Sequence, residues 1–98
     1  MMIRIVKMTF QAEKVPAFLE KFNANKQHIR NFEGVEHLSL LKDKKQTNIF
    51  FTYSHWQSEA HLENYRKSAF FKQFWSELKP YFAAKAEAWS VDAIEILE

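Results

Sequence analysis

The chain has 98 residues, of which 47% are hydrophobic and 27% charged, with one glycine and two prolines; this composition excludes a disordered or fibrous protein. It has no cysteine, which excludes disulfides, thiolate metal sites and a cysteine nucleophile. The 14 Lys and Arg residues are interspersed with 12 acids, and the net charge is only +2, so we expect no nucleic-acid partner. A chain of this length predicts one domain over residues 1–98.

The N-terminal half begins with period-2 alternation of side chains, which predicts a first strand over residues 2–10. Polar residues follow too soon for a signal peptide or a membrane span, and we expect a cytoplasmic protein. A stripe at helical spacing then predicts a helix of about five turns. Its members are Val15, Phe18, Leu19, Phe22, Ile29 and Phe32. Pro16 suits the start of this helix, and Gly34 suits its end.

The rest of the chain predicts a hairpin, two helices and a last strand. Residues 35–42 and 47–56 favour two strands joined by a polar turn, where the KDKK run is expected to be solvated. Ser58 and Ser68 are suitable N-caps for two short helices, and a strand over residues 86–97 ends the chain. The order βαββαβ, with a split second helical region, predicts an α+β, ferredoxin-like fold with helices on one face.

Both faces of this predicted sheet carry apolar side chains. Within the first strand, alternation separates Ile3 and Ile5 from Val6, Met8 and Phe10. Within the third it separates Ile49, Phe51 and Tyr53 from Phe50 and Trp56, and within the last it separates Trp89 and Val91 from Ile94 and Ile96. One set of helices covers only one face. We therefore expect a homodimer through the other sheet face; the alternative is a monomer that exposes scattered aromatics.

Several motifs resemble those of the antibiotic biosynthesis monooxygenase domain family. They are FEGV at the start of the second strand (Phe32 to Val35), WQSEAHL at the start of the second helix (Trp56 to Leu62) and Ser-x-x-Phe at Ser68 to Phe71. The resemblance covers essentially the whole chain. It implies a dimeric α+β barrel with a pocket between helices and sheet in each protomer.

Members of that family include quinol oxygenases that use neither metal nor flavin, as well as haem-degrading enzymes. The haem-degrading members use an Asn, a Trp and an iron-ligating His, and the corresponding positions here are Val6, Tyr65 and Trp75. These substitutions argue against haem degradation, because valine donates no hydrogen bond and tryptophan does not ligate iron. Quinol-oxidising relatives often carry a His at the position of Tyr65.

The aromatic stretch YRKSAFFKQFW, Tyr65 to Trp75, is the main candidate for a substrate pocket. Phe71 and Phe74 fit a core stripe, whereas Tyr65 and Trp75 have polar atoms suited to a cavity. The predicted catalytic residues are His37 and Tyr65, with Trp75, Phe74, Tyr81 and His61 as substrate contacts. His37 is expected on the same face as Val35 and is the preferred base.

Three functions remain open from the sequence. The first is a cofactor-independent monooxygenase of a small quinol or electron-rich aromatic, which needs an aromatic-lined pocket and removal of a substrate proton. The second is a non-catalytic dimeric module that binds an apolar ligand. The third has every aromatic in the core and the dimer interface, without a pocket. No metal-ligand spacing is present among the four histidines, so we expect no metal or cofactor.

Overall fold

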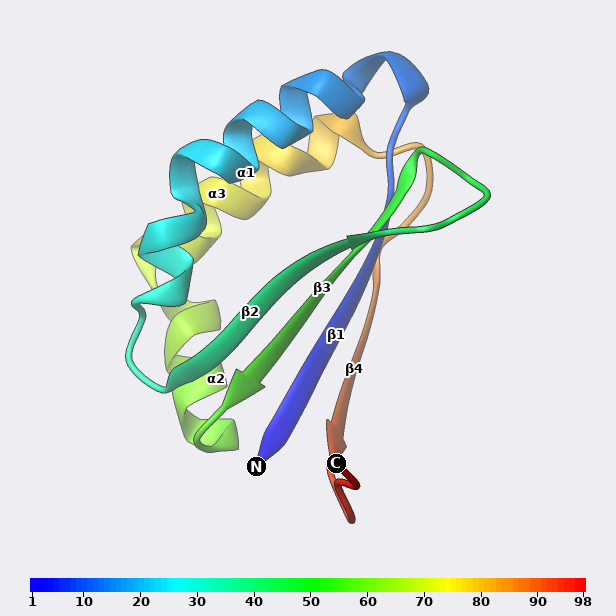
Figure 1. Cartoon of the computed structure of the whole chain (residues 1–98). Helices are drawn as coiled ribbons and strands as arrows, with labels where there is room; N and C mark the ends of the chain where they lie inside the picture. The colour runs from blue at the N-terminus through cyan, green and yellow to red at the C-terminus, as the bar shows by residue number, and fades with distance from the viewer.

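The computed structural model describes all 98 residues as a four-stranded antiparallel sheet with the helices on one face (Figure 1). In chain order the elements are β1 (Met2–Thr9), a 3-10 turn (Ala12–Lys14), α1 (Val15–Arg30), β2 (Val35–Lys42), β3 (Ile49–Trp56), α2 (Glu59–Lys67), α3 (Ala69–Leu78), a second 3-10 turn (Lys79–Tyr81) and β4 (Glu87–Asp92). The strand order is β2-β3-β1-β4. The predicted α+β, ferredoxin-like fold is confirmed.

Local sequence signals set the helix ends. The Ser58 hydroxyl accepts a hydrogen bond from the backbone N–H of His61 at 3.2 Å, and the Ser68 hydroxyl accepts one from Phe71 at 3.1 Å. Both serines are therefore the predicted N-caps. Pro16 lies in the first turn of α1, where its missing N–H is not needed.

The last strand is shorter than predicted. β4 pairs only with β1, and Asp92 is opposite Met2, the first residue of that partner. Beyond Asp92 no strand remains to accept or donate hydrogen bonds, so pairing stops there. Ile94 and Ile96 consequently lie outside the sheet, with 98% and 60% of their surface exposed.

The hydrophobic core lies between the inner sheet face and the helices. The most deeply buried large side chains are Trp56, Phe10, Phe18, Met8 and Leu78. Phe10 stacks on Phe18 with ring centroids 4.1 Å apart, which ties β1 to α1. Leu19 was predicted in the same stripe of α1 but is 41% exposed. The helix face that packs on the sheet is the one with Phe18, Phe22 and Ile29, and Leu19 lies at its margin.

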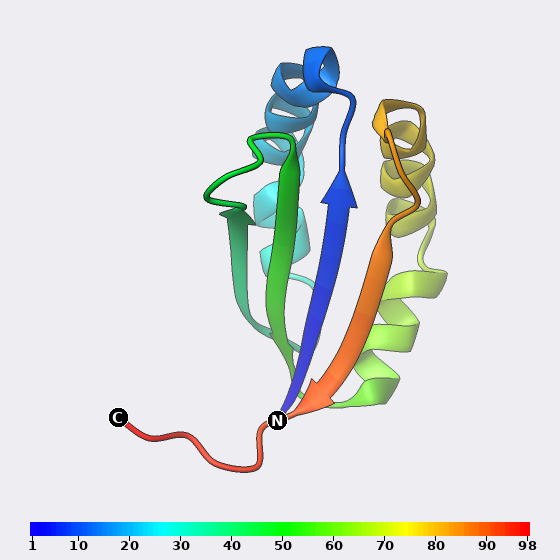
Figure 2. The ribbon, with the colours of Figure 1, turned by 90° about the vertical axis from the view of Figure 1, so that its right-hand side faces the viewer.

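The outer sheet face has no helix over it (Figure 2). Side chains on this face include the half-buried Ile5 and Phe51 and the more exposed Leu41, Trp89 and Val91, each 44–47% accessible. The prediction that both faces carry apolar side chains is thus confirmed. No helix in the structure is long and apolar enough to cross a membrane; the cytoplasmic location stays a prediction.

Candidate functional site

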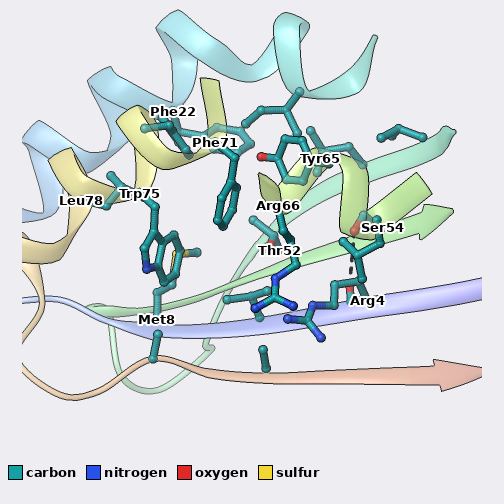
Figure 3. A pocket seen from close by; sticks show the side chains of 18 of the residues that line it. Arg4, Met8, Phe22, Thr52, Ser54, Tyr65, Arg66, Phe71, Trp75 and Leu78 are labelled. Atoms are coloured by element: carbon teal, nitrogen blue, oxygen red, sulfur yellow. Dashed lines mark hydrogen bonds between the residues drawn. The ribbon is translucent and has the colours of Figure 1, made fainter. Parts of the chain in front are cut away.

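A cavity of about 330 Å³ lies between the inner sheet face and the helices (Figure 3). Sixteen of its 20 lining residues are hydrophobic. The polar exceptions are Arg4, Thr52, Ser54 and Arg66, and the lining includes no Asp, Glu or His. An apolar space of this size with a few polar groups is typical of a small-molecule site.

Helix α3 supplies one aromatic wall of the cavity. Phe71, Phe74 and Trp75 are spaced three and four residues apart, so a single face of the helix presents all three. Phe71 and Trp75 stack with ring centroids 5.8 Å apart. These contacts fix the rings of the wall against one another, and a flat aromatic ligand would meet their surfaces.

Helix α2 places Tyr65 in the cavity wall. The residue is only 8% exposed, and its ring contacts those of Phe32, Trp56 and Phe71 at centroid distances of 5.0–5.3 Å. Burial raises the pKa of the Tyr65 hydroxyl well above its ordinary value. The hydroxyl is therefore neutral at physiological pH, the form that can donate or accept a hydrogen bond.

Arg4 brings a positive charge to the inner sheet face from β1. Its register partners are Ser54 on β3 and Ser90 on β4, two small residues that leave room for the long side chain. Its Nη1 donates to the Ser90 hydroxyl at 2.9 Å. Burial lowers the pKa of Arg4, the nearby Arg66 lowers it further, and Glu63 partly offsets both.

Arg66 follows Leu62 by four residues and therefore lies on the same face of α2. Its Nη1 is 3.0 Å from Glu63 Oε1, and 47% of its side-chain surface is exposed. The guanidinium groups of Arg66 and Arg4 lie side by side at one end of the cavity (Figure 3). We call these two residues the arginine pair; they make this end of the cavity cationic.

Three of the predicted site residues lie together in the cavity lining. Tyr65, Phe74 and Trp75 all face this space, so the aromatic stretch does contribute to a pocket. Phe71, which the sequence pattern indicated for the core, faces it as well. The catalytic and binding roles of these residues stay predictions.

His37 does not line the cavity. It was expected on the face of Val35, but a bulge between the two residues shifts the register: Val35 is opposite Trp56, whereas His37 is opposite His55. The bulge therefore turns His37 to the outer sheet face, where its Nε2 lies 2.5 Å from the Ser39 hydroxyl. A base role for His37 in this cavity is excluded by its position.

His61 and Tyr81 also lie outside the lining. The His61 ring covers Gly34, and its Nδ1 is 2.7 Å from the Ser58 hydroxyl, so this residue holds the start of α2 against the loop between α1 and β2. Tyr81 follows α3 in a 3-10 turn, and its ring lies beneath Lys14 Nζ at 6.0 Å from the centroid. Both make structural contacts away from the cavity.

The arginine pair was missed at the sequence level, although periodicity contained the signal. Arg4 shares the even positions of β1 with Met2, Val6 and Met8, which places a charge within a buried apolar set. Arg66 follows Leu62 by one helical turn. A cation on the core-facing stripe of both a strand and a helix indicates a charged site between the two elements.

The positions that correspond to the haem-degrading residues, Val6, Tyr65 and Trp75, share this one cavity. Their side chains provide neither the amide nor the imidazole of that chemistry. The lining as a whole has no imidazole or carboxylate group for an iron, so these residues do not fit haem held in the manner of those relatives.

The family model described as antibiotic biosynthesis monooxygenase matches residues 1–76, whereas no curated protein matches the sequence. A solved structure described as antibiotic biosynthesis monooxygenase has 16% identity and a TM-score of 0.90, covering 97% of this chain and 100% of its own. A conserved protein from Methanosarcina mazei has 21% identity and a TM-score of 0.85, with 92% and 90% covered.

A Mycobacterium tuberculosis protein has 10% identity and a TM-score of 0.88, with 99% of this chain and 98% of its own covered. At these identities the solved structures support the fold alone. The family match spans most of the chain and runs from β1 into α3, the elements that build most of the cavity. The chain belongs to the antibiotic biosynthesis monooxygenase family.

Proposed function

We propose that this protein is a cofactor-independent monooxygenase that acts on a small quinol or a related electron-rich aromatic. The observation that supports this most is the cavity, which combines aromatic walls, a small volume and a cationic end. Family membership supports the same reaction class. An aromatic substrate would lie against Phe71 and Trp75 with an oxygen substituent toward Tyr65 or the arginine pair.

The reaction needs only the substrate and dioxygen. A quinol that has lost a proton is an electron-rich anion and transfers an electron to O₂. Recombination at a ring carbon forms a C–O bond, and cleavage of the O–O bond leaves one oxygen on the ring. The other oxygen leaves as water with two hydrogens of the substrate, so quinol and O₂ give a hydroxyquinone and water.

The cavity favours the substrate anion without a side-chain base. No Asp, Glu or His lines it, so the proton passes to water at the end where Arg66 is exposed. The positive charges of the arginine pair lower the pKa of a nearby substrate hydroxyl. Tyr65, neutral because burial raises its pKa, donates a hydrogen bond to the oxyanion.

Oxygen uptake by metal-stripped protein, measured against hydroquinones and anthrones, tests this function. We expect uptake above the uncatalysed rate, reduced by about tenfold or more in Tyr65→Phe, which keeps the ring and removes the donor. Tyr53→Phe makes the same change on the outer sheet face and should leave the rate unchanged. Absence of uptake from folded protein would contradict the proposal.

The alternative is a non-catalytic module that binds an aromatic ligand in the same cavity, and the absence of a base from the lining favours it. Such a module predicts ligand-dependent stabilisation without turnover. At a hundredfold excess of ligand over Kd, the free energy of unfolding should rise by about 2.7 kcal/mol. Thermal unfolding with and without ligand, beside oxygen uptake, separates the two functions.

We further propose that the protein works as a homodimer through the outer sheet face. Leu41, Trp89 and Val91 are each nearly half exposed there, beside the partly buried Ile5 and Phe51. A second copy would cover these side chains, since a two-fold axis pairs identical surfaces. No helix of the same chain reaches this face (Figure 2).

A further inference from the structure

We infer that the ligand of the cavity is an aromatic acid, with its ring between the walls of α3 and the sheet and its carboxylate on the arginine pair. The inference deepens the proposed function, because it uses the same cavity and names the class of substrate. It rests on charge, donor geometry and the composition of the lining. A neutral quinol would use the aromatic walls but leave the cationic end without a partner.

The charges at this end are not balanced within the chain. Arg4 and Arg66 bring two positive charges, and Glu63, paired with Arg66 at 3.0 Å, is the one carboxylate in contact with them. Arg4 forms no salt bridge. Its pKa is lowered mainly by burial and in second place by the positive charge of Arg66. One negative charge from a ligand would remove that excess.

Each guanidinium of the arginine pair uses one nitrogen, Nη1, for a side-chain hydrogen bond within the chain, to Ser90 for Arg4 and to Glu63 for Arg66. A guanidinium carries five N–H donors in a planar fork. The only hydrogen bond that the Arg4 side chain donates within the chain is that of Nη1 to Ser90, which fixes the side chain across the sheet. A planar carboxylate accepts two parallel hydrogen bonds from such a fork, a geometry that a neutral hydroxyl lacks.

The rest of the lining favours a ligand that is apolar apart from one negatively charged group. Away from the arginine pair the walls are almost entirely hydrophobic, so a second charged group would be buried without a partner. The absence of Asp and Glu from the lining means that nothing in the cavity repels the carboxylate. An aromatic monocarboxylate satisfies both conditions, whereas a phosphate with two charges exceeds the single charge that is unbalanced.

Calorimetry with 1-naphthoate and its neutral analogue 1-naphthamide, under nitrogen, tests the inference without turnover. We expect the acid to bind at least about tenfold more tightly than the amide, as a charge-assisted hydrogen bond would give. Its affinity should fall as sodium chloride is raised, because Arg66 is partly exposed and its charge is screened. Equal affinity for the two ligands, or no binding of either, would overturn the inference.

Arg4→Gln and Arg66→Gln assign the effect to the arginine pair. Each should weaken binding of the acid about tenfold or more and leave the amide unchanged. Lys67→Gln removes the same charge from an exposed neighbour outside the lining and should not alter either affinity. Thermal unfolding of each variant shows that it is folded, and undiminished acid binding in both arginine variants would refute the assignment.

The two proposals fail separately. Binding of the acid that depends on the arginine pair, without oxygen uptake for any quinol, would uphold the inference and remove the monooxygenase. Uptake with neutral quinols, together with no preference for the acid, would uphold the monooxygenase and remove the inference.

Discussion

Tyr65 shows how one side chain belongs to both the core and the cavity. Its ring is packed among Phe32, Trp56 and Phe71, so the aromatic body contributes to the fold. Its hydroxyl is the only part that a phenylalanine would lack. The ring contributes stability through area removed from water, and under the proposed function the hydroxyl is the part that binds the substrate.

Gly34 is the residue at which backbone geometry leaves no choice of side chain. Its φ is +95°, and a Cβ added there would lie 2.4 Å from the Cβ of His61. Gly34→Ala should lower the free energy of unfolding by about 1–3 kcal/mol from backbone strain, and by more because of the overlap with His61. Urea denaturation measures the loss.

A second substitution separates the two causes. Removing the ring in Gly34→Ala/His61→Ala should relieve the overlap in part and leave the cost of the positive φ. The reference is the single variant His61→Ala, which also loses the contact of this ring with Ser58. An unfolding midpoint of Gly34→Ala equal to that of the wild type would show that the loop rearranges without cost.

At the scale of elements, the bulge in β2 decides which side chains reach the cavity. Glu36 is the extra residue between Val35, opposite Trp56, and His37, opposite His55. If Glu36 were an ordinary paired residue, strict alternation would place His37 on the inner face with Val35. Because the bulge leaves Glu36 without a register partner, His37 lies on the outer face instead, and Leu38, opposite Ser54, lines the cavity.

The turn between β2 and β3 depends on Asp43. Its Oδ2 accepts hydrogen bonds from the backbone N–H groups of Lys45 at 3.0 Å and Gln46 at 2.8 Å, and these lower its pKa. A lowered pKa means that the ionised group stabilises the fold above its unfolded pKa and that this contribution is lost as pH falls. Asp43→Ala should therefore lower Tm at neutral pH.

The same reasoning predicts how this effect varies with pH. The difference in Tm between wild type and Asp43→Ala should shrink as pH falls from about 5 through the lowered pKa of the carboxyl, since the native group becomes protonated. Calorimetric scans at several pH values measure it. A difference that persists unchanged in acid would mean that the carboxylate charge is not what stabilises this turn.

At the scale of the whole molecule, an apolar outer sheet face predicts self-association. We expect a mass of about twice 11.7 kDa in sedimentation equilibrium. Trp89→Glu should give monomers, because the two-fold axis would bring two carboxylates into an apolar interface. Leu19→Glu places the same charge on α1, at a side chain of similar exposure, and should remain dimeric. A monomeric wild type would contradict the dimer.

The sequence by itself determined the order of elements and the two apolar sheet faces. Alternation in β1 and β3, the caps Ser58 and Ser68 and the turn around Asp43 are local signals, each read within a few residues. The same signals grouped Phe71, Phe74 and Trp75 on one face of α3, although they indicated the core for Phe71, which also lines the cavity.

Only the tertiary structure decided which polar groups share the cavity. Arg4 and Arg66 are far apart in the chain, and they meet because α2 lies over the inner sheet face that carries β1. His37 lies on the outer sheet face, away from the cavity, because of a bulge in β2 that the alternation pattern does not reveal. Helical and strand periods fix the direction of each side chain within its element, whereas proximity between elements depends on packing and register across the whole fold.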